Sequence, residues 1–424
     1  MPFAVTEPLR QEVERAFPDR PFAVRFWDGS VLPATGGRGL EFTIRSPRAV
    51  AHALRAPGQL GIGRAYVSGE IVPNDIDAAM DLLQEWKPAP VDGKTKARLM
   101  VAAARAVGVT KPPKRPRAEI ILSGKAHSRE RDAQAVRHHY DVSNEFFRLF
   151  LGDDMTYSCA IFSRGARTLA EAQETKLDLV AAKLGLRAGE RLLDVGCGWG
   201  SMAIHAARHY GVSVVGITLS QPQAEVARRR VADAGLADKI EIRVQDYRDL
   251  GGEQFDAVSS IGMVEHVGDE NLDEYARVLY AALKPGGRLL NHGITRLRHT
   301  DPKAGPFSER YVFPDGAPLH LSRNLLAIER AGFVTQHVEG FANDYAETLR
   351  HWYENLDAQL DVATRLAGEE RIRVWRLYLR TARNGFLTGF IGIYQVRAQK
   401  PGPGVLPGQT PAGADGRGQS ALGR

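Results

Sequence analysis

The sequence predicts an α/β protein with a mostly parallel, doubly wound sheet, preceded by a small α+β domain. The first observation is that short apolar stretches rich in β-branched residues alternate with amphipathic stretches from residue 191 to 338. This is the pattern of parallel strands joined by helices. The second is a strand at 192–195 that runs into a glycine-rich turn and then a helix, Ser201–Tyr210. In doubly wound folds, ligands bind where such strands end.

Length and composition fit this prediction. The 424 residues, 43% of them hydrophobic, allow two or three domains and at least one large core. No uncharged apolar run reaches the ~18 residues of a membrane-spanning helix, and no basic stretch followed by an apolar one suggests a signal peptide. The two cysteines, Cys159 and Cys197, exclude a disulfide framework, so we expect a reduced, cytoplasmic protein.

The net charge of +6 is unevenly distributed. Residues 97–137 hold ten lysines and arginines against three acidic residues. Such a stretch can face water, an anionic membrane or nucleic acid. Because it contains no nucleic-acid motif and no interleaved aromatic residues, we rank a solvated surface first, anionic lipid second and nucleic acid last.

Residues 1–86 are expected to form the small α+β domain. Strands are predicted at 22–26 and 41–44, separated by turn residues. Ser46 and Pro47 can start a helix, and 75–86 is another helix.

Residues 87–135 are expected to form a basic linker and helical segment. A helix is predicted at 95–106. The three prolines within 111–117 deny a helix, which leaves a linker or an exposed loop.

Residues 136–400 are expected to form the large domain, and 401–424, rich in glycine, proline and small polar residues, a disordered tail. Further strands are predicted at 212–218, 240–244, 255–261, 288–294, 334–338 and 390–397. Further helices are predicted at 220–234, 271–283, 321–331, 344–366 and 371–384, with 284–287 as the stop of the second of these.

The glycine-rich turn contains Gly196, Gly198 and Gly200 at alternate positions. Glycine lets backbone approach a ligand closely, because it has no Cβ. The spacing differs from dinucleotide-binding and phosphate-binding loops. Asp194 precedes the turn and suits a ligand with a cationic or amine end. We therefore interpret the turn, with Cys197 inside it, as an S-adenosylmethionine site, although an ordinary tight turn would look similar.

The next two strands end in further polar groups. The second strand ends without the acidic residue that usually binds a ribose, but Thr218, Ser220 and Gln223 offer hydroxyl and amide groups. Ser220 is also a natural helix N-cap. After the third strand, Asp246 and Tyr247 place a carboxylate and a ring where adenine would lie.

Six motifs follow one another in the large domain. They are Val-Arg-His-His-Tyr-Asp-Val-Ser-Asn-Glu-Phe-Phe at 136–147, Met-Thr-Tyr-Ser-Cys-Ala-Ile-Phe at 155–162, the glycine-rich turn, Gly-Ile-Thr-Leu-Ser at 216–220, Gln-Asp-Tyr-Arg-Asp at 245–249 and Gly-Met-Val-Glu-His-Val-Gly at 262–268. Their order and spacing resemble the cyclopropane fatty acid synthase family over residues 136–398. Residues 56–86 are loosely similar, through the stretch at 60–70, to the small N-terminal domain of bacterial, phospholipid-acting members.

The resemblance implies a Rossmann-like S-adenosylmethionine-dependent methyltransferase. In the family, a cis double bond of an acyl chain attacks the sulfonium methyl group, a carbocation forms, and a base removes a proton so that a cyclopropane ring closes. Such a site must hold the alkene in attack geometry, exclude water and supply a base.

The resemblance also implies the site residues. The base would be a bound bicarbonate ion, held by Cys159, Glu265, His292 and Tyr345 with backbone from Ile294. The implied cofactor-binding residues are Tyr157, Ser158, Asp194, Gly196, Cys197, Gly198, Gly200, Thr218, Leu219, Ser220, Gln223, Gln245, Asp246 and Tyr247. Tyr157 and Ser158 would touch the methionine end of the cofactor. The chain departs from common members at 291–293.

Each implied residue has an ordinary structural alternative. Cys159 could be a small buried hydrophobe, His292 a satisfied core histidine and Tyr345 a helix-surface aromatic. A metal site from Glu265, His266 and His292 is a further alternative, but no metal-ligand spacing supports it, and we expect none. Aromatic residues suited to shelter a cation are Tyr157, Phe162, Tyr311, Phe313, Trp352, Tyr353 and Tyr394.

We therefore expect a cytoplasmic enzyme, peripheral to the inner face of the membrane and possibly a homodimer, that converts an unsaturated phospholipid acyl chain to a cyclopropane fatty acid. The same methyl transfer followed by a hydride shift would instead give an exomethylene branch, which a partner reductase could reduce. A lipid-binding protein on a degenerate methyltransferase fold, and a methyltransferase for a small soluble acceptor, are the remaining alternatives.

Overall fold

The computed structural model describes residues 5–37, 39–108, 111–125, 127–132, 134, 143–298, 305–316 and 318–402. The chain divides into two compact units, Met1–Ile121 with Gly305–Val312 and Ala367–Asn384, and Leu122–Ala304 with Phe313–Leu366 and Gly385–Arg424. The first unit takes in more of the chain than the domain expected at 1–86. Residues 136–142 of the first motif and 403–424 of the expected tail lie outside the described residues.

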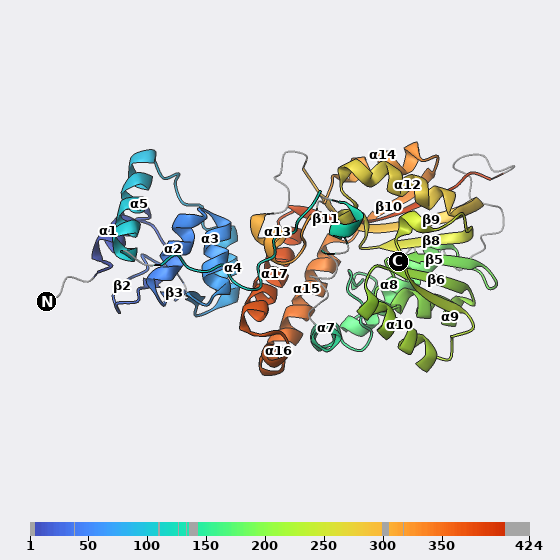
Figure 1. The fold of residues 1–424 in the computed structure, drawn as a ribbon, viewed down its shortest axis with the longest axis horizontal. Coiled ribbons are helices and arrows are strands. Elements are labelled where there is room, and N and C mark those ends of the chain that lie inside the picture. The colour runs from blue at the N-terminus through green and yellow to red at the C-terminus, as the bar shows by residue number, and fades with distance from the viewer. Residues whose placement is uncertain are drawn as a thin grey trace. The chain divides into compact units, whose positions relative to one another are not determined.

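The first unit combines helices with one small sheet (Figure 1). Its strands pair in the order β2-β1-β3-β4, with β1 parallel to β3 and the other pairs antiparallel. The elements are α1 (Glu7–Ala16), β1 (Ala23–Arg25), β2 (Val31–Leu32), β3 (Glu41–Ile44), α2 (Pro47–Arg55), α3 (Gln59–Val67), β4 (Ile71–Pro73), α4 (Ile76–Glu85), α5 (Gly93–Val107), α13 (Pro306–Tyr311) and most of α17 (Glu369–Leu387).

Local signals explain where its helices begin. The Ser46 hydroxyl accepts a hydrogen bond from the Arg48 N–H at 3.1 Å, and Pro47 is the first helical residue, as the sequence predicts. The Asp75 carboxylate caps α4 in the same way. The sequence analysis did not predict α1, nor α3, β2 and β4, of which the strands are only two and three residues long and α3 is weakly periodic.

A buried carboxylate joins three stretches of the first unit. The Glu119 side chain is 1% exposed and accepts hydrogen bonds of 2.7 and 2.6 Å from the Arg64 guanidinium of α3. The Tyr311 hydroxyl of α13 donates to the same carboxylate at 3.2 Å. Burial alone would raise the pKa of Glu119, but the hydrogen bonds from Arg64 and Tyr311 and the charge of Arg64 together outweigh it and lower the pKa. This carboxylate therefore fixes its own segment and α13 to α3.

The second unit holds the large sheet. Its strands are β5 (Arg191–Val195), β6 (Ser213–Thr218), β7 (Ile240–Val244), β8 (Phe255–Ile261), β9 (Leu283–Arg296), β10 (Val334–Gly340) and β11 (Ile391–Gln399). Its α-helices are α7 (Asn144–Leu151), α8 (Leu169–Leu184), α9 (Ser201–Tyr210), α10 (Gln221–Asp233), α11 (Val264–Val267), α12 (Leu272–Ala281), α14 (Leu321–Arg330), α15 (Ala342–Asp357) and α16 (Leu360–Ala367). Two short 3₁₀ turns are Tyr247–Asp249 and Asp269–Asn271.

The strand order β10-β11-β9-β8-β5-β6-β7 confirms the predicted doubly wound sheet. Strands β5 to β9 are parallel, and β11 runs antiparallel to both its neighbours. The chain winds outward from β5 to β7 and then returns to β8, so the topological switch point lies between β5 and β8. Ligands of such sheets bind at the carboxyl ends of the strands that flank this point.

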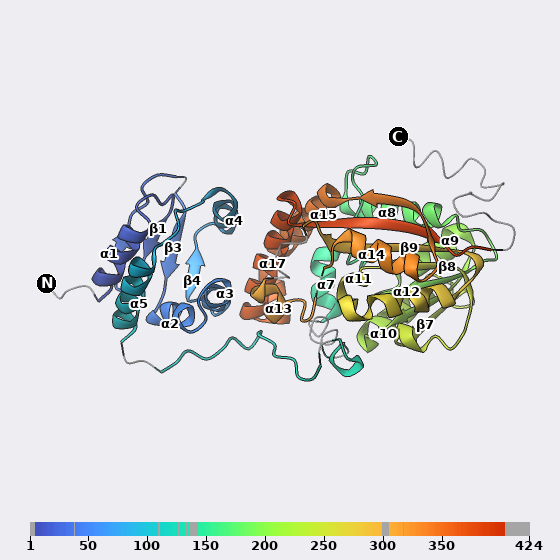
Figure 2. The same cartoon turned by 90° about the horizontal axis from the view of Figure 1, so that it is seen from above.

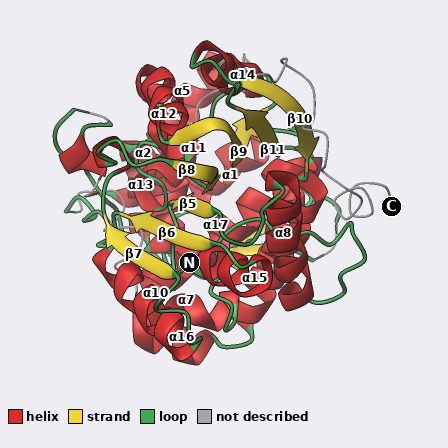
Figure 3. Cartoon of the chain, turned by 90° about the vertical axis from the view of Figure 1, so that its right-hand side faces the viewer, coloured by secondary structure: helices red, strands yellow, loops and turns green. Residues whose placement is uncertain are grey.

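Helices cover both faces of this sheet, as Figures 2 and 3 show. Successive residues of β5 point to opposite faces. Leu192 packs with side chains of α8, α9 and α10, whereas Leu193 packs with side chains of α11, α12 and α14. The turn after β5 is therefore held between two apolar layers.

Two predicted boundaries are wrong. The helix expected at 344–366 is two helices, α15 and α16, and between them the Gln359 side chain donates to the Leu149 carbonyl at 2.8 Å. The helix before 284–287 does end there, at Ala281, but the strand expected at 288–294 already begins at Leu283. Backbone bonds with Lys400 extend it: the Gly286 N–H donates to the Lys400 carbonyl at 3.0 Å, and the Lys400 N–H donates to the Gly287 carbonyl at 2.9 Å. Within the described part of the chain, no helix is both long and apolar enough to cross a membrane.

Replacing Arg64 by leucine should lower the free energy of unfolding by about 3 kcal/mol or more, because Glu119 then stays buried without its guanidinium. Urea unfolding followed by circular dichroism measures the change. Arg25→Leu is the control, since the Arg25 side chain is 47% exposed and its pair with Glu41 should contribute less than about 1 kcal/mol. Equal losses in the two variants would contradict this assignment.

Candidate active site

The glycine-rich turn lies where the carboxyl ends of β5 and β8 meet. A Cβ built on Gly196, whose φ is +77°, would come 2.7 Å from Met263 Sδ, so no side chain fits there. A Cβ on Gly198, with φ +54°, would have no heavy atom of the described residues within 4 Å. Gly200, with φ +84°, precedes α9. The turn thus packs tightly on one side and leaves backbone open at Gly198, as close approach of a ligand requires.

The turn is tied to β6 through its backbone. The N–H groups of Gly196 and Cys197 both donate to the Ile217 carbonyl at 2.9 Å. Cys197 is 7% exposed and faces Gly216, where a Cβ would come 3.1 Å from its sulfur. Cys197 therefore packs between strands, and burial raises the pKa of its thiol well above the ordinary value.

Asp194, the second-last residue of β5, is buried, with 2% of its surface exposed. Its Oδ1 accepts a hydrogen bond from the Ser259 hydroxyl of β8 at 2.7 Å, while its Oδ2 has no partner among the described residues. Burial raises the pKa of Asp194 to about 6, although Ser259 and nearby Lys176 lower it. A buried carboxylate oxygen without a donor fits an incoming amine or hydroxyl group.

The polar residues after β6 bond to one another. The Thr218 hydroxyl donates to the Gln223 side chain at 2.9 Å, and the Ser220 hydroxyl accepts from the Gln223 N–H at 3.3 Å. Ser220 is therefore the N-cap of α10, the structural role that the sequence also allowed. Leu219 lies half-buried between them.

The residues after β7 are also engaged. The Gln245 amide donates to the Asp249 carbonyl at 2.6 Å. Burial alone would raise the pKa of Asp246, but hydrogen bonds from Arg248 of 2.8 and 2.6 Å lower it. The Tyr247 ring belongs to the apolar core, with its centroid 5.4 Å from that of Tyr275.

A loop between α7 and α8 presents Tyr157, Ser158 and Cys159. The Ser158 carbonyl accepts from the Gln173 amide at 2.9 Å, and the Ser158 hydroxyl accepts from the Lys176 ammonium at 3.0 Å. The Tyr157 ring packs on Trp352, with centroids 5.2 Å apart. Helix α8 thus fixes the backbone of this loop.

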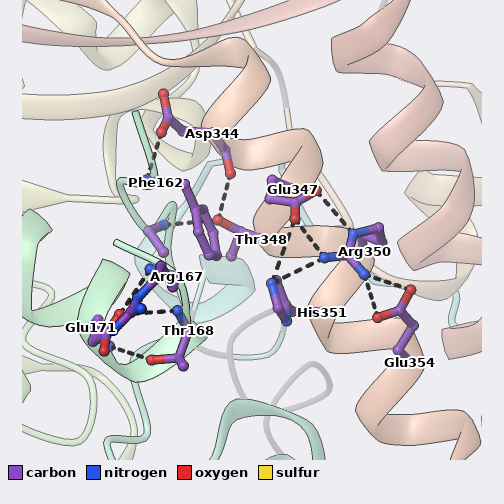
Figure 4. A network of polar contacts seen from close by, with 11 residues as sticks. Phe162, Arg167, Thr168, Glu171, Asp344, Glu347, Thr348, Arg350, His351 and Glu354 are labelled. Atoms are coloured by element: carbon purple, nitrogen blue, oxygen red, sulfur yellow. Dashed lines mark hydrogen bonds and ion pairs between the residues drawn. The ribbon is translucent and has the colours of Figure 1, made fainter. Parts of the chain in front are cut away.

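Helix α15 holds the same loop from the other side (Figure 4). The Asp344 carboxylate accepts the N–H groups of Phe162 and Ser163, both at 2.7 Å, and the Thr348 hydroxyl accepts the Ala160 N–H at 3.0 Å. Cys159 is fully buried between these anchors, and burial, with the Asp344 charge, raises the pKa of its thiol well above the ordinary value. The sulfur therefore stays protonated and can donate a hydrogen bond.

Glu265 and Ile294 meet at the end of β9. The Ile294 N–H donates to the Glu265 carboxylate, but burial dominates and raises the pKa of Glu265 to about 7. Glu265 Oε2 has no partner among the described residues. A Cβ on Gly293 would come 2.1 Å from Val264 Cγ1 and 3.1 Å from Glu265 Oε2. Gly293 therefore allows α11 to approach β9 at this point.

His292, Cys159 and the backbone of Tyr345 lie beside Phe341, while the Tyr345 ring packs on Phe386 and Trp352 with centroids 4.7 and 5.9 Å apart. The Cys159 sulfur lies 3.8 Å from the Phe341 carbonyl oxygen, to which the Tyr345 N–H donates at 3.0 Å. The His292 ring centroid is 6.2 Å from that of Phe341. His292 is 1% exposed, and burial, with the charges of Lys176 and Lys183, lowers the pKa of its imidazole well below the ordinary value. Its Nε2 has no partner in the described part of the chain.

The sequence analysis missed Gln173, Lys176 and Phe341. The signal for α8 was present, since Thr168 and Glu171 form a capping box that Figure 4 shows. No sequence signal marks Phe341, because its backbone carbonyl makes the contact.

The aromatic residues named from sequence separate into groups. Tyr157, Trp352 and Tyr345 pack together. Tyr311 was expected to shelter a cation, but it lies in the first unit with its hydroxyl on Glu119. The described residues contain no cluster of three or more histidine, cysteine, aspartate or glutamate side chains placed to hold a metal ion.

Comparison with known proteins agrees with this geometry. The family described as mycolic acid cyclopropane synthetase matches residues 127–396. A probable fatty acid methyltransferase of Mycobacterium tuberculosis is 40% identical over 403 residues, which are 92% of this chain and 94% of that protein. The cyclopropane-fatty-acyl-phospholipid synthase of Escherichia coli is 33% identical over 366 residues, which are 86% of this chain and 89% of that protein.

A solved structure is similar as well. A mycolic acid cyclopropane synthase crystallised with SAH and CTAB gives a TM-score of 0.60 at 34% identity, covering 63% of this chain and 98% of that one. The resemblance drawn from the six motifs is therefore confirmed. Because the family match spans more than half of the sequence and the fold agrees, this chain belongs to the cyclopropane synthase family of S-adenosylmethionine-dependent methyltransferases.

Proposed function

We propose that this methyltransferase acts on the cis double bond of an unsaturated phospholipid acyl chain and forms a cyclopropane fatty acid. The observation that carries the proposal is that Cys159, His292 and the backbone of Tyr345 all lie beside Phe341. Glu265 of α11 accepts the N–H of Ile294, two residues after His292 on β9. These groups lie in the unit that carries the glycine-rich turn. The relatives support methyl transfer from S-adenosylmethionine to an unsaturated fatty acyl chain.

The residues at the switch point fit S-adenosylmethionine, which supplies an electrophilic methyl group on a sulfonium centre. The open backbone at Gly198 allows close approach, and Asp194 Oδ2 is a buried acceptor without a donor among the described residues. Ser158, fixed by Gln173 and Lys176, offers a polar group from the facing loop. We propose that these residues hold the cofactor.

The acceptor chemistry determines what else the site must do. An alkene is a weak nucleophile, so it must be held against the methyl group in attack geometry. When the new carbon–carbon bond forms, positive charge is left on the acyl chain. Loss of one proton from the added methyl group then closes the ring, so the lipid gains one CH₂ overall and S-adenosylhomocysteine leaves.

We propose that a bicarbonate ion held by Cys159, Glu265, His292 and Tyr345 accepts this proton. The side chains fit an oxyanion. The Cys159 thiol is protonated, and Glu265 Oε2 and His292 Nε2 are buried without partners in the described residues. The Ile294 N–H keeps the Glu265 carboxylate in place.

Aromatic rings give the developing cation a dry environment. Trp352 is fully buried, and Tyr157 and Tyr345 pack against it. Ring faces stabilise a desolvated cation by up to about 2 kcal/mol each, and they exclude water that would trap it.

We propose further that the enzyme works at the membrane surface, because its substrate is a phospholipid. Exposed lysines and arginines at 111–117 offer positive charge to anionic headgroups.

Lipid mass spectrometry of a host that expresses the protein tests the proposal, after feeding methionine deuterated on its methyl group. We expect a mass gain of one CH₂ that keeps two of the three methyl deuteriums, in a lipid that resists mild hydrogenation. The same gain in a reducible lipid would show the exomethylene product and point to a partner reductase.

Purified protein assayed with vesicles and with soluble acceptors is the matching control. Labelling of a soluble acceptor without vesicles would refute the phospholipid substrate. Tight cofactor binding with no labelled lipid would point to a lipid-binding protein instead.

Glu265→Gln should lower the rate at which the lipid product forms by about 10²- to 10⁴-fold, the range expected when a positioned acid–base group is lost. Glu270→Gln is the matched control, because the Glu270 side chain is 81% exposed. Full activity of the Glu265 variant would disprove the assignment of this residue to the proton-accepting site.

The same substitution should stabilise the protein at high pH. Since burial raises the pKa of Glu265 to about 7, the folded state binds a proton between about pH 4.5 and 7 that the unfolded state releases. Stability therefore falls as pH rises through this range. Glu265→Gln should exceed the wild type by up to about 3 kcal/mol at pH 8 and by much less at pH 5, measured by urea unfolding. A difference that does not grow with pH would contradict this.

A further inference from the structure

Helix α8 carries two buried lysines, Lys176 and Lys183, which are 1% and 4% exposed. They are seven residues apart, about two helical turns, so they lie on the same face of the helix. A buried ammonium group is costly unless an anion and further hydrogen bonds compensate it. The two lysines meet this requirement very differently.

Lys183 has its compensation inside the protein. Its ammonium donates to the Glu339 carboxylate at 2.5 Å and to the Gln395 side-chain oxygen at 2.6 Å. Burial lowers the pKa of Lys183, and the bond to Glu339 opposes this effect. The charge of Lys183 is therefore paired.

Lys176 has no such partner. Within the described residues its ammonium makes one hydrogen bond, to the neutral Ser158 hydroxyl at 3.0 Å, and no ion pair. Burial lowers the pKa of Lys176 to about 8, while Cys159 and Asp194 raise it. The group is thus still charged at neutral pH, with donor capacity left over.

The surroundings of Lys176 belong to both parts of the proposed site. Ser158 and Asp194 are on the cofactor side, and Cys159 and His292 are on the side of the base. The charge of Lys176 helps burial to lower the pKa of His292, and it opposes the rise that burial causes in the pKa of Asp194. An anion that enters here would meet a positive charge from the wall of the site.

We propose that Lys176 is an anion-binding residue of this site and that its ammonium holds a carboxylate-type anion beside Ser158. The inference rests on the proposed function, which brings two such anions: the carboxylate of the methionine part of the cofactor, and bicarbonate. Both present oxygens of a planar carboxyl group to an ammonium donor.

Isothermal titration calorimetry of Lys176→Met distinguishes the sources. The probes are S-adenosylhomocysteine and 5′-methylthioadenosine, which lacks the amino acid part. If Lys176 holds the methionine carboxylate, affinity for S-adenosylhomocysteine falls roughly ten- to a hundredfold, while affinity for methylthioadenosine changes less than about twofold. Lys176→Arg should recover part of the loss.

The bicarbonate arm uses thermal unfolding of the full chain with saturating S-adenosylhomocysteine, in bicarbonate against chloride at equal ionic strength. A ligand that binds the folded state raises the unfolding temperature. If bicarbonate is the anion, Lys176→Met loses this rise and keeps its affinity for S-adenosylhomocysteine.

Two outcomes would overturn the proposal. Parallel losses of affinity for both adenosine probes would reduce Lys176 to a support of the Ser158 loop, and no change in either arm would remove it from the site. Lys183→Met is the matched control. The ratio of its affinities for S-adenosylhomocysteine and methylthioadenosine should equal that of the wild type. Lys176→Gln, which can still donate to Ser158, replaces the methionine variant if that one does not fold. Neither experiment contains lipid. A failure of the proposed lipid reaction would therefore appear only in the lipid mass spectrometry and would be distinguishable from a failure of this proposal.

Discussion

Burial of charged groups near the carboxyl ends of β5, β8 and β9, on the strands and on the helices α8 and α11, is the constraint on which the second unit depends. Asp194, Glu265 and Lys176 are 2%, 8% and 1% exposed. Burial raises the pKa of the two carboxyls and lowers that of the ammonium, so each group is held at an energetic cost. Apolar side chains of similar size would stabilise the fold better. The helices on both faces of the sheet supply the apolar packing that offsets this cost.

The groups reach each other because two glycines remove side chains where segments cross. Gly196 allows the residue after β8 to approach the turn after β5, and Gly293 allows α11 to approach β9. The clash that a Cβ would make at Gly293 is with Val264 and Glu265 themselves. Its effect is to set how far the Glu265 carboxylate stands from the end of β9. Backbone packing, as much as the acidic residue, therefore defines the side of the site to which we assign proton acceptance.

Local patterns predicted those elements whose signals are local. The strands at 240–244 and 255–261 and the helix at 201–210 agree to the residue, because turn residues bound each apolar run. Lys176 could not be recognised, since a lysine on an amphipathic helix usually faces solvent and its burial depends on the loop around Ser158. The importance of Phe341 rests on a carbonyl oxygen, which no side-chain pattern encodes. The site residues were implied by the family resemblance, through their positions in the motifs. The structure adds which of these residues lie close to one another.

The charge states of the buried groups together favour an anion. Burial raises the pKa of the Cys159 thiol and lowers that of the His292 imidazole, so both are neutral at pH 7. An anion among them would meet hydrogen-bond donors and the Lys176 ammonium, while the carboxylates of Glu265, Asp194 and Asp344 would oppose it. Because burial brings the pKa of Glu265 to about 7, an arriving negative charge shifts this carboxyl toward its protonated form, which is itself a donor. The same burial that destabilises Glu265 as a carboxylate would thus adapt the site to the proposed oxyanion, and it would keep the proposed acyl cation away from water.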